Sequence, residues 1–221
     1  VMPIPYDKNW LGRKQLRQPD LLPELAIFTV KPLSSKRIQA FWDAIPEEFQ
    51  GGTLTVEPAS VPEKPGGFSV DTAGGSALFL NQPYDEIIGD FPPAYHEGLI
   101  RAEAAMLKPV SSFKPEKLAA FWLEVNGKSA TNEWKFHAMQ RLMYQVLHRS
   151  WGGSHVVAGP DGKPLAMTFI VYSHGRIFPL FATESKAGKA VGALTLLWDN
   201  LLKTHADKNL KVRREEVMGI W

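Results

Sequence analysis

The sequence predicts a mixed α/β (α+β) fold in which a mostly antiparallel sheet is flanked by helices. The prediction rests first on the last third of the chain, where apolar runs at 154–158, 164–172 and 176–183 are separated by short turn sequences. It rests second on the middle third, where apolar residues recur at helical spacing over 114–125 and 134–149. An antiparallel meander packed against helices accounts for both patterns.

The two turns of the expected meander contain the residue types that tight turns need. Residues 159–162 read Gly-Pro-Asp-Gly, and residues 173–175 read Ser-His-Gly. After the third strand, an apolar helix is expected over 187–204 and a closing strand over 210–212. This order of strand, helix and strand predicts a crossover connection at the end of the sheet.

The first third of the chain is expected to be richer in strands than in helices. Strand-like segments occupy 10–18, 25–31 and 53–57, and a helix is expected over 34–45. A further helix over 92–107 begins at a proline pair, which a first helical turn tolerates.

Composition and charge limit the classes of protein to consider. The 221 residues are 44% hydrophobic and 22% charged, which is ordinary for a globular protein. A net charge of +2 argues against nucleic acid as a main partner, because phosphate binding needs a clustered basic surface. No run of about 18 apolar residues predicts a membrane span. The sequence leaves the oligomeric state open.

The sequence contains no cysteine, which excludes disulfides, thiolate metal sites and cysteine nucleophiles. This absence is typical of a reducing compartment, so a cytoplasmic protein is expected. His137, His148 and His155 have no metal-binding spacing with carboxylates, so no metal site is expected. A fragment is expected, with more chain missing before Val1 than after Trp221.

A resemblance to a known family is carried by the sequence from Pro160 to Ala193, continued by Leu196-Leu197-Trp198. A hairpin is followed there by a strand ending in a small residue, and then by a loop opening a helix with glycine in its first turns. This segment resembles the acyl-CoA N-acyltransferase (GNAT) superfamily, in its Fem-like branch with two GNAT-type units per chain. The segment from Met2 to Phe28, with Ala44-Ile45-Pro46, resembles the end of a first unit. The resemblance thus implies an incomplete first unit over 1–85 and a second unit over 86–221.

The resemblance implies a site for the diphosphate of acyl-CoA or acetyl-CoA at the start of the last long helix. Backbone N–H groups at a helix N-terminus bind anions, and glycines let a diphosphate approach closely. The residues expected to hold the cofactor are Lys186, Gly188, Lys189, Gly192 and Ala193, although their spacing is looser than in a typical GNAT loop. The alternative is a helix start whose glycines only pack against the sheet.

Three residues are candidates for the chemistry of acyl transfer. Glu184 ends the strand before the loop, where GNAT enzymes often place a general base, although a negative charge is also favourable near a helix N-terminus. His174 could move a proton near neutral pH, or could be an exposed turn residue. Tyr172 could protonate a leaving thiolate, or could be a core aromatic residue.

Three functions follow as hypotheses from the resemblance. The first is an N-acyltransferase that transfers an acyl group from acyl-CoA to a small-molecule amine. The second is a catalytically inactive GNAT-fold protein that binds a metabolite or a partner chain. The third is a Fem-like aminoacyl transferase, which predicts tRNA binding that weakens steeply with salt. The balanced charge counts against this third hypothesis.

Overall fold

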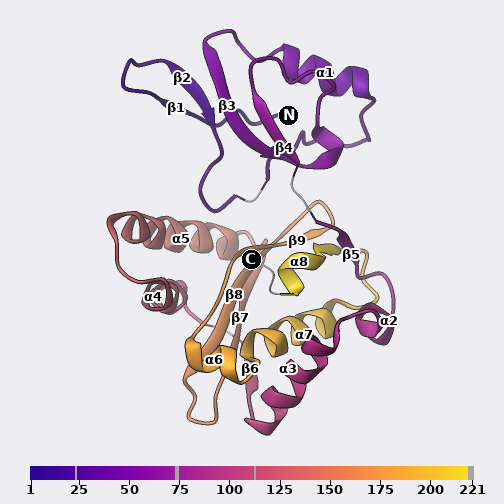
Figure 1. The fold of residues 1–221 in the computed structure, drawn as a ribbon, viewed down its shortest axis with the longest axis vertical. Helices are drawn as coiled ribbons and strands as arrows, with labels where there is room; N and C mark the ends of the chain where they lie inside the picture. Colours follow the sequence, from indigo (N-terminus) through magenta and orange to yellow (C-terminus); the bar gives the residue numbers. More distant parts are fainter. Residues whose placement is uncertain (23, 73–74, 112, 219–221) are drawn as a thin grey trace. The chain divides into compact units, whose positions relative to one another are not determined.

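The computed structural model describes residues 1–221 except for 23, 73–74, 112 and 219–221, and it confirms the mixed α/β class (Figure 1). The contacts divide the chain into two compact units, Val1–Gly74 and Gly75–Trp221. The sequence placed this division between residues 85 and 86. The structure places it earlier because a strand at Ala77–Phe79 pairs within the sheet of the second unit.

The first unit contains a mixed sheet of four strands in the order β1-β2-β3-β4. Its hydrophobic core forms where Leu16, Leu54 and Val56 of the sheet meet Trp42 of the helix. The expected strand over 25–31 is reduced to a single bridge from Leu25 to Val56. The elements of this unit are β1 (Tyr6–Lys8), β2 (Lys14–Arg17), α1 (Ser35–Asp43), β3 (Phe49–Val56), the 3-10 helix η1 (Pro58–Ser60) and β4 (Ser69–Thr72).

The second unit is built on a sheet of six strands in the order β5-β10-β9-β8-β7-β6. The expected meander is confirmed, since β6, β7, β8 and β9 are successive antiparallel neighbours. The pair β9–β10 is parallel, as a crossover connection requires. The strands are β5 (Ala77–Phe79), β6 (Lys108–Ser111), β7 (Gly152–Ala158), β8 (Pro164–Ser173), β9 (Arg176–Glu184) and β10 (Lys211–Arg213).

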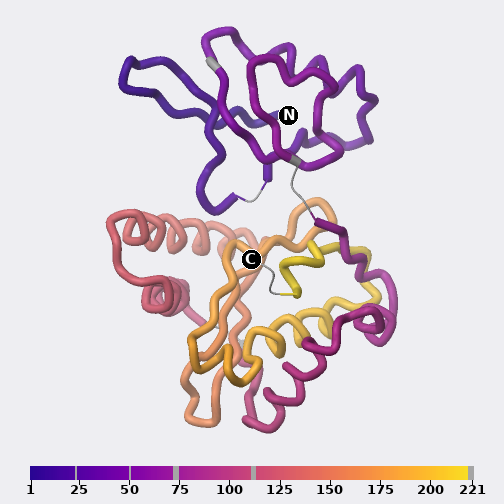
Figure 2. Tube along the Cα trace, in the orientation of Figure 1, coloured from indigo at the N-terminus to yellow at the C-terminus, as the bar shows by residue number. Residues whose placement is uncertain are grey.

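Helices cover both faces of this sheet (Figures 1 and 2). Helix α7 packs on one face together with α3, while α4 and α5 form a hairpin against the other face. Among the described residues, no helix is both long and apolar enough to cross a membrane. The helices are α2 (Tyr84–Gly89), α3 (Pro93–Ala104), α4 (Pro115–Asn126), α5 (Ala130–His148), α6 (Lys186–Ala190), α7 (Ala193–His205) and α8 (Arg214–Val217).

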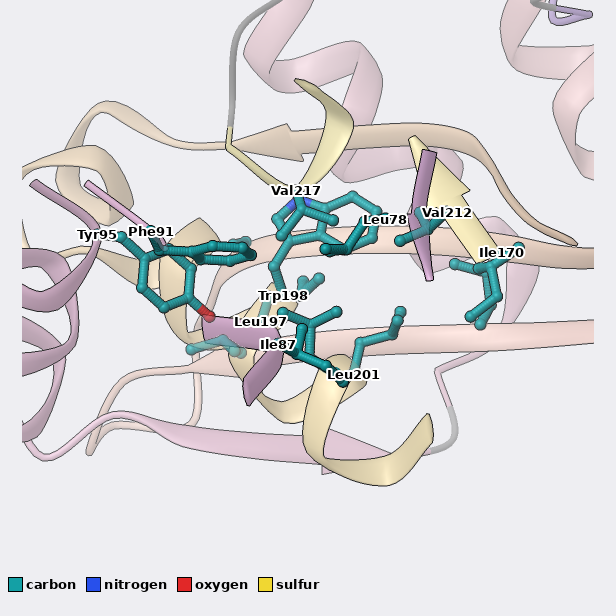
Figure 3. Close-up of a cluster of buried hydrophobic side chains, with 14 of the residues drawn as sticks. Leu78, Ile87, Phe91, Tyr95, Ile170, Leu197, Trp198, Leu201, Val212 and Val217 are labelled. Atoms are coloured by element: carbon teal, nitrogen blue, oxygen red, sulfur yellow. The ribbon is translucent and has the colours of Figure 1, made fainter. Parts of the chain in front are cut away.

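The larger hydrophobic core lies between α7 and the sheet (Figure 3). Leu197, Trp198 and Leu201 supply the apolar face of α7, and each is at most 1% exposed. Ile170 of β8 and Val212 of β10 meet them from the sheet. Burying one large apolar side chain contributes roughly 1.5–3 kcal/mol, so this face of α7 holds the crossover helix on the sheet.

The expected helix over 187–204 is two helices, α6 and α7, separated at Gly192. Gly192 has a left-handed backbone conformation, with φ of 73°. A Cβ atom at this position would overlap the backbone carbonyl of Gly98 in α3. The break therefore lies where α3 and α7 approach each other closely, which a helical pattern of apolar residues does not reveal.

Candidate functional site

The parallel strands β9 and β10 pair at one position and then part. Arg176 is opposite Lys211, and the Lys211 N–H donates to the Gly175 carbonyl at 2.9 Å. Beyond Arg176, no described residue of β9 is paired with β10, which pairs over its whole length with β5 on its other side. Ligands of open α/β sheets bind beyond the carboxyl ends of such strands, so this parting is the first feature of a candidate site.

A β-bulge lies halfway along β9. Phe169 of β8 is opposite Phe181, and the next residue, Ile170, is opposite Pro179, so that Leu180 is the extra residue. Proline has no N–H to donate to a ladder and is therefore confined to edges and bulges within sheets. A bulge also bends the strand that contains it, and bulges are frequent beside active sites.

The loop expected to hold the cofactor lies at the carboxyl end of β9 and runs through α6 to α7. Lys186 and Lys189 are exposed, whereas Gly188, Gly192 and Ala193 are buried. The N–H of Gly188 donates to Ser185 Oγ at 3.0 Å. A side chain at Gly188 would clash with the backbone carbonyl of Leu165. The two lysines can therefore reach a ligand, while the glycines contact other parts of the protein.

The Glu184 side chain extends from the end of β9 to the first turn of α7, close to where the sequence placed the diphosphate. Its carboxylate accepts a hydrogen bond from the Leu194 N–H at 3.3 Å. Burial raises the pKa of the Glu184 carboxyl, while the Leu194 hydrogen bond and the Lys189 charge partly oppose this shift. A half-buried carboxylate with a raised pKa suits a general base, and here it also satisfies an N–H in the first turn of the helix.

Tyr172 and His174 lie at the other end of β9 from Glu184. Tyr172 is opposite Ile177, near the turn that contains His174. The seven residue steps from Ile177 to Glu184 span roughly 23 Å of extended strand. The structure therefore does not bring Glu184 together with Tyr172 and His174. His174 itself is exposed, with φ of 49° and its Nδ1 2.8 Å from Ser173 Oγ.

Tyr172 instead forms a hydrogen-bonded pair with His205, the last residue of α7. The His205 Nδ1 lies 2.7 Å from the Leu201 carbonyl, which can only accept, so Nδ1 carries the proton. The Tyr172 hydroxyl therefore donates to His205 Nε2 at 2.6 Å. The sequence did not point to His205, because it continues the apolar face of the helix.

His155 adds a second, half-buried imidazole on this side of the sheet. Burial, with a smaller effect of the His205 charge, lowers the pKa of His155 to about 4. Burial also lowers the pKa of His205. Both imidazoles are therefore neutral at pH 7 in the folded protein.

The free energy of unfolding is expected to fall at acidic pH because of the lowered pKa of His155. Its folded pKa lies below the ordinary value of 6.5, so between pH 6.5 and about 4 the unfolded chain binds more protons than the folded one. The stability due to neutral His155 is present above pH 6.5 and is lost as the pH falls to 4, by roughly 3 kcal/mol. Urea unfolding at several pH values measures this loss. The variant His155→Gln should flatten the dependence, and the exposed His137→Gln should not; equal curves for both variants would contradict the assignment.

A third group of polar side chains surrounds Asp199, on the side of α7 that faces α2 and α3. Asp199 is 2% exposed, and its carboxylate accepts hydrogen bonds from the hydroxyls of Tyr84 and Tyr95. Lys203 forms an ion pair with it at 2.9 Å. Burial, followed by the neighbouring carboxylate, raises the pKa of both tyrosines. These contacts join three helices and leave Asp199 closed to a ligand.

Comparison of the chain with protein-family models, with curated proteins and with solved structures finds no match in any of the three. Within the described residues, no three histidine, aspartate or glutamate side chains gather as a metal-binding group. The case for a function therefore rests on the site itself.

Proposed function

We propose that residues 75–221 form an N-acyltransferase unit, which transfers an acyl group from acyl-CoA to a small-molecule amine. The observation that carries the proposal is the parting of β9 from β10 after the single pair Arg176–Lys211. A strand edge without a partner can bind an extended chain through its peptide groups. The pantetheine arm of CoA is such a chain, since it contains two amides.

The loop after β9 supports the same proposal. Lys186 and Lys189 are exposed beside the first turn of α7, where a diphosphate would gain both their charge and the helix dipole. To reach the Leu194 N–H, the diphosphate has to displace the Glu184 carboxylate. Cofactor binding would thus release the Glu184 carboxylate from the Leu194 N–H. The pantetheine arm holds the thioester far from the diphosphate, so the proton of the attacking amine goes to another group. The amine attacks the thioester directly, and the protein supplies position and proton removal.

Acetyl-CoA at 1 mM is expected to raise the melting temperature of the protein. A ligand present at 100 times its Kd stabilises a protein by about 2.7 kcal/mol. For a protein of this size that corresponds to roughly 5–10 °C. Differential scanning fluorimetry measures the shift. Lys189→Ala should reduce it, whereas Lys163→Ala, a change at an exposed lysine in the β7–β8 turn, should leave it intact. No shift for the wild-type protein would contradict the proposal.

A non-catalytic GNAT-fold protein that binds a metabolite or a partner chain is the second candidate. Two observations favour it: Glu184 already satisfies the Leu194 N–H, and Gly192 packs against the backbone of Gly98. The protein's own groups thus occupy the first turn of α7. The two candidates differ in turnover: release of free CoA in the presence of a panel of amines supports the enzyme, and binding without release supports this alternative.

A further inference from the structure

The core of the second unit contains a hydrogen-bond donor without an acceptor. Trp198 is 0% exposed, and no described residue accepts a hydrogen bond from its indole Nε1–H. An indole nitrogen can only donate, and a buried donor left unpaired destabilises the folded state. Such groups are rare in native proteins and call for an explanation, such as an acceptor that arrives with a ligand.

The unpaired donor lies in the core that packs against β9 and β10. Ile177 and Val212 are the first residues of these strands beyond the paired position, and both belong to the same buried cluster as Trp198. Val217 of α8 completes this cluster, and Figure 3 shows it beside the Trp198 ring. The donor therefore belongs to the same core as the first residues of the two strands beyond their single pair, where the acyl-donor site was proposed.

The surroundings of the indole limit the chemistry of the missing acceptor. Apolar side chains pack in the same core as Trp198, among them Leu78, Val212 and Val217. A charged group would lose its hydration among these side chains, which favours a neutral acceptor. A carbonyl oxygen on a flexible apolar chain meets this condition, and an acyl-CoA carries such carbonyls in its thioester and in its pantetheine amides.

We infer that the Trp198 indole N–H donates a hydrogen bond to a neutral carbonyl of the acyl donor, which enters between β9 and β10 and displaces Val217. This inference rests on the proposed function and adds a binding residue to it. The displaced cover is a single turn, since α8 spans only Arg214–Val217. Two hydrogen bonds hold this turn in place. The Arg214 guanidinium donates to the Asp90 carbonyl at 2.9 Å, and the Glu215 carboxylate accepts from the Ser76 N–H at 2.9 Å.

The variant Trp198→Phe tests the inference, because it removes the N–H and keeps an aromatic ring. The Kd for acetyl-CoA, measured by isothermal titration calorimetry, should rise by about five- to tenfold. The urea midpoint of the free protein should fall only by the cost of the ring atoms removed from the core, because no hydrogen bond is lost. The matched control is Trp42→Phe, since the Trp42 indole donates to the Ser60 carbonyl at 3.1 Å. That control should lower stability and leave the affinity unchanged.

The indole signal of Trp198 gives a direct readout on the wild-type chain, even if the variant does not fold. The chain has seven tryptophans, and the ¹H–¹⁵N indole peak absent from Trp198→Phe identifies the residue. If that variant does not fold, selective ¹⁵N labelling and triple-resonance assignment identify the peak. It should move downfield on addition of acetyl-CoA. The same movement with CoA assigns the acceptor to a pantetheine amide, and movement with acetyl-CoA alone assigns it to the thioester.

The failures of the inference and of the proposed function are distinguishable. Binding of acetyl-CoA with an unmoved Trp198 signal, or with equal affinity in Trp198→Phe, overturns the inference and leaves the acyltransferase proposal standing. If Trp198→Phe loses as much stability as Trp42→Phe, the Trp198 indole N–H already has an acceptor in the free protein. That result also overturns the inference. Absence of any acetyl-CoA binding overturns both.

Discussion

Replacement of Gly192 by alanine is expected to destabilise the protein by about 2–5 kcal/mol. A left-handed backbone costs an alanine about 1–2 kcal/mol relative to glycine. The added methyl group would also overlap the Gly98 carbonyl, and forcing extra atoms into a packed contact costs about 1–3 kcal/mol. Relief by moving α3 is blocked, since Gly98 itself lies against the Thr195 side chain of α7. Urea unfolding monitored by circular dichroism measures the change.

Two other glycines separate the causes of this loss. Gly162 has φ of 76° with no atom near the position of its missing Cβ, so Gly162→Ala reports backbone strain alone. Gly188 is close to the Leu165 carbonyl without a left-handed φ, so Gly188→Ala reports the clash alone. The Gly192→Ala loss should exceed each of them. If Gly192→Ala loses only as much stability as Gly162→Ala, then α3 and α7 move apart to accommodate the added methyl group at little cost.

The Gly192 result also bears on how cofactor binding is tested. Because Gly192 is needed for the contact between α3 and α7, a variant there could lose acetyl-CoA binding through unfolding. Lys189 is exposed and forms no such contact, so its replacement is the cleaner probe of a diphosphate site.

Replacement of Asp199 by alanine is expected to destabilise the protein by about 3 kcal/mol. The change leaves the buried Tyr95 hydroxyl without its acceptor and removes the ion pair with Lys203. Breaking a buried polar network by removing one member typically costs about 3–5 kcal/mol, and the exposed side of this pair reduces that value. Asp199→Asn keeps an acceptor oxygen and should cost less. Thermal and urea unfolding measure both variants.

A surface aspartate provides the control for Asp199. Asp161 forms an exposed ion pair with Lys163 at 3.4 Å, so Asp161→Ala should cost about 1 kcal/mol or less. A double-mutant cycle of Asp199→Ala with Tyr84→Phe should show coupling, because these side chains share a hydrogen bond. Equal losses for Asp199→Ala and Asp161→Ala, without coupling, would mean that the buried network contributes nothing.

The meander was predictable because strands and tight turns are encoded locally. The turns at 159–162 and 173–175 join the strands expected from their apolar runs, and the structure extends each strand by at most a few residues. The helical spacing of apolar residues likewise predicted α4 and α5. It was wrong about the continuous helix over 187–204, because the break at Gly192 depends on α3, which lies far away in the sequence.

The candidate site was less predictable than the fold. Glu184 and the lysines after it could be named, because a loop between a strand and a helix is recognisable in sequence. The separation of Tyr172 from Glu184 was also readable, since a strand of that length places its ends far apart. The sequence did not single out Asp199 or His205, and Trp198 entered only as part of the family resemblance. All three lie on buried positions of α7, where helical spacing does not distinguish a polar partner from core.

The sequence alone determined the class of fold, the order of the meander and the stretch of chain that crosses back over the sheet. These features depend on the period of apolar residues and on turn chemistry, which act over a few residues. Only the tertiary structure decided that β9 and β10 part, that Glu184 caps α7 and that the Trp198 N–H is left unpaired. Each of these depends on contacts between residues that are far apart in the sequence, and the local pattern of residues does not specify such contacts.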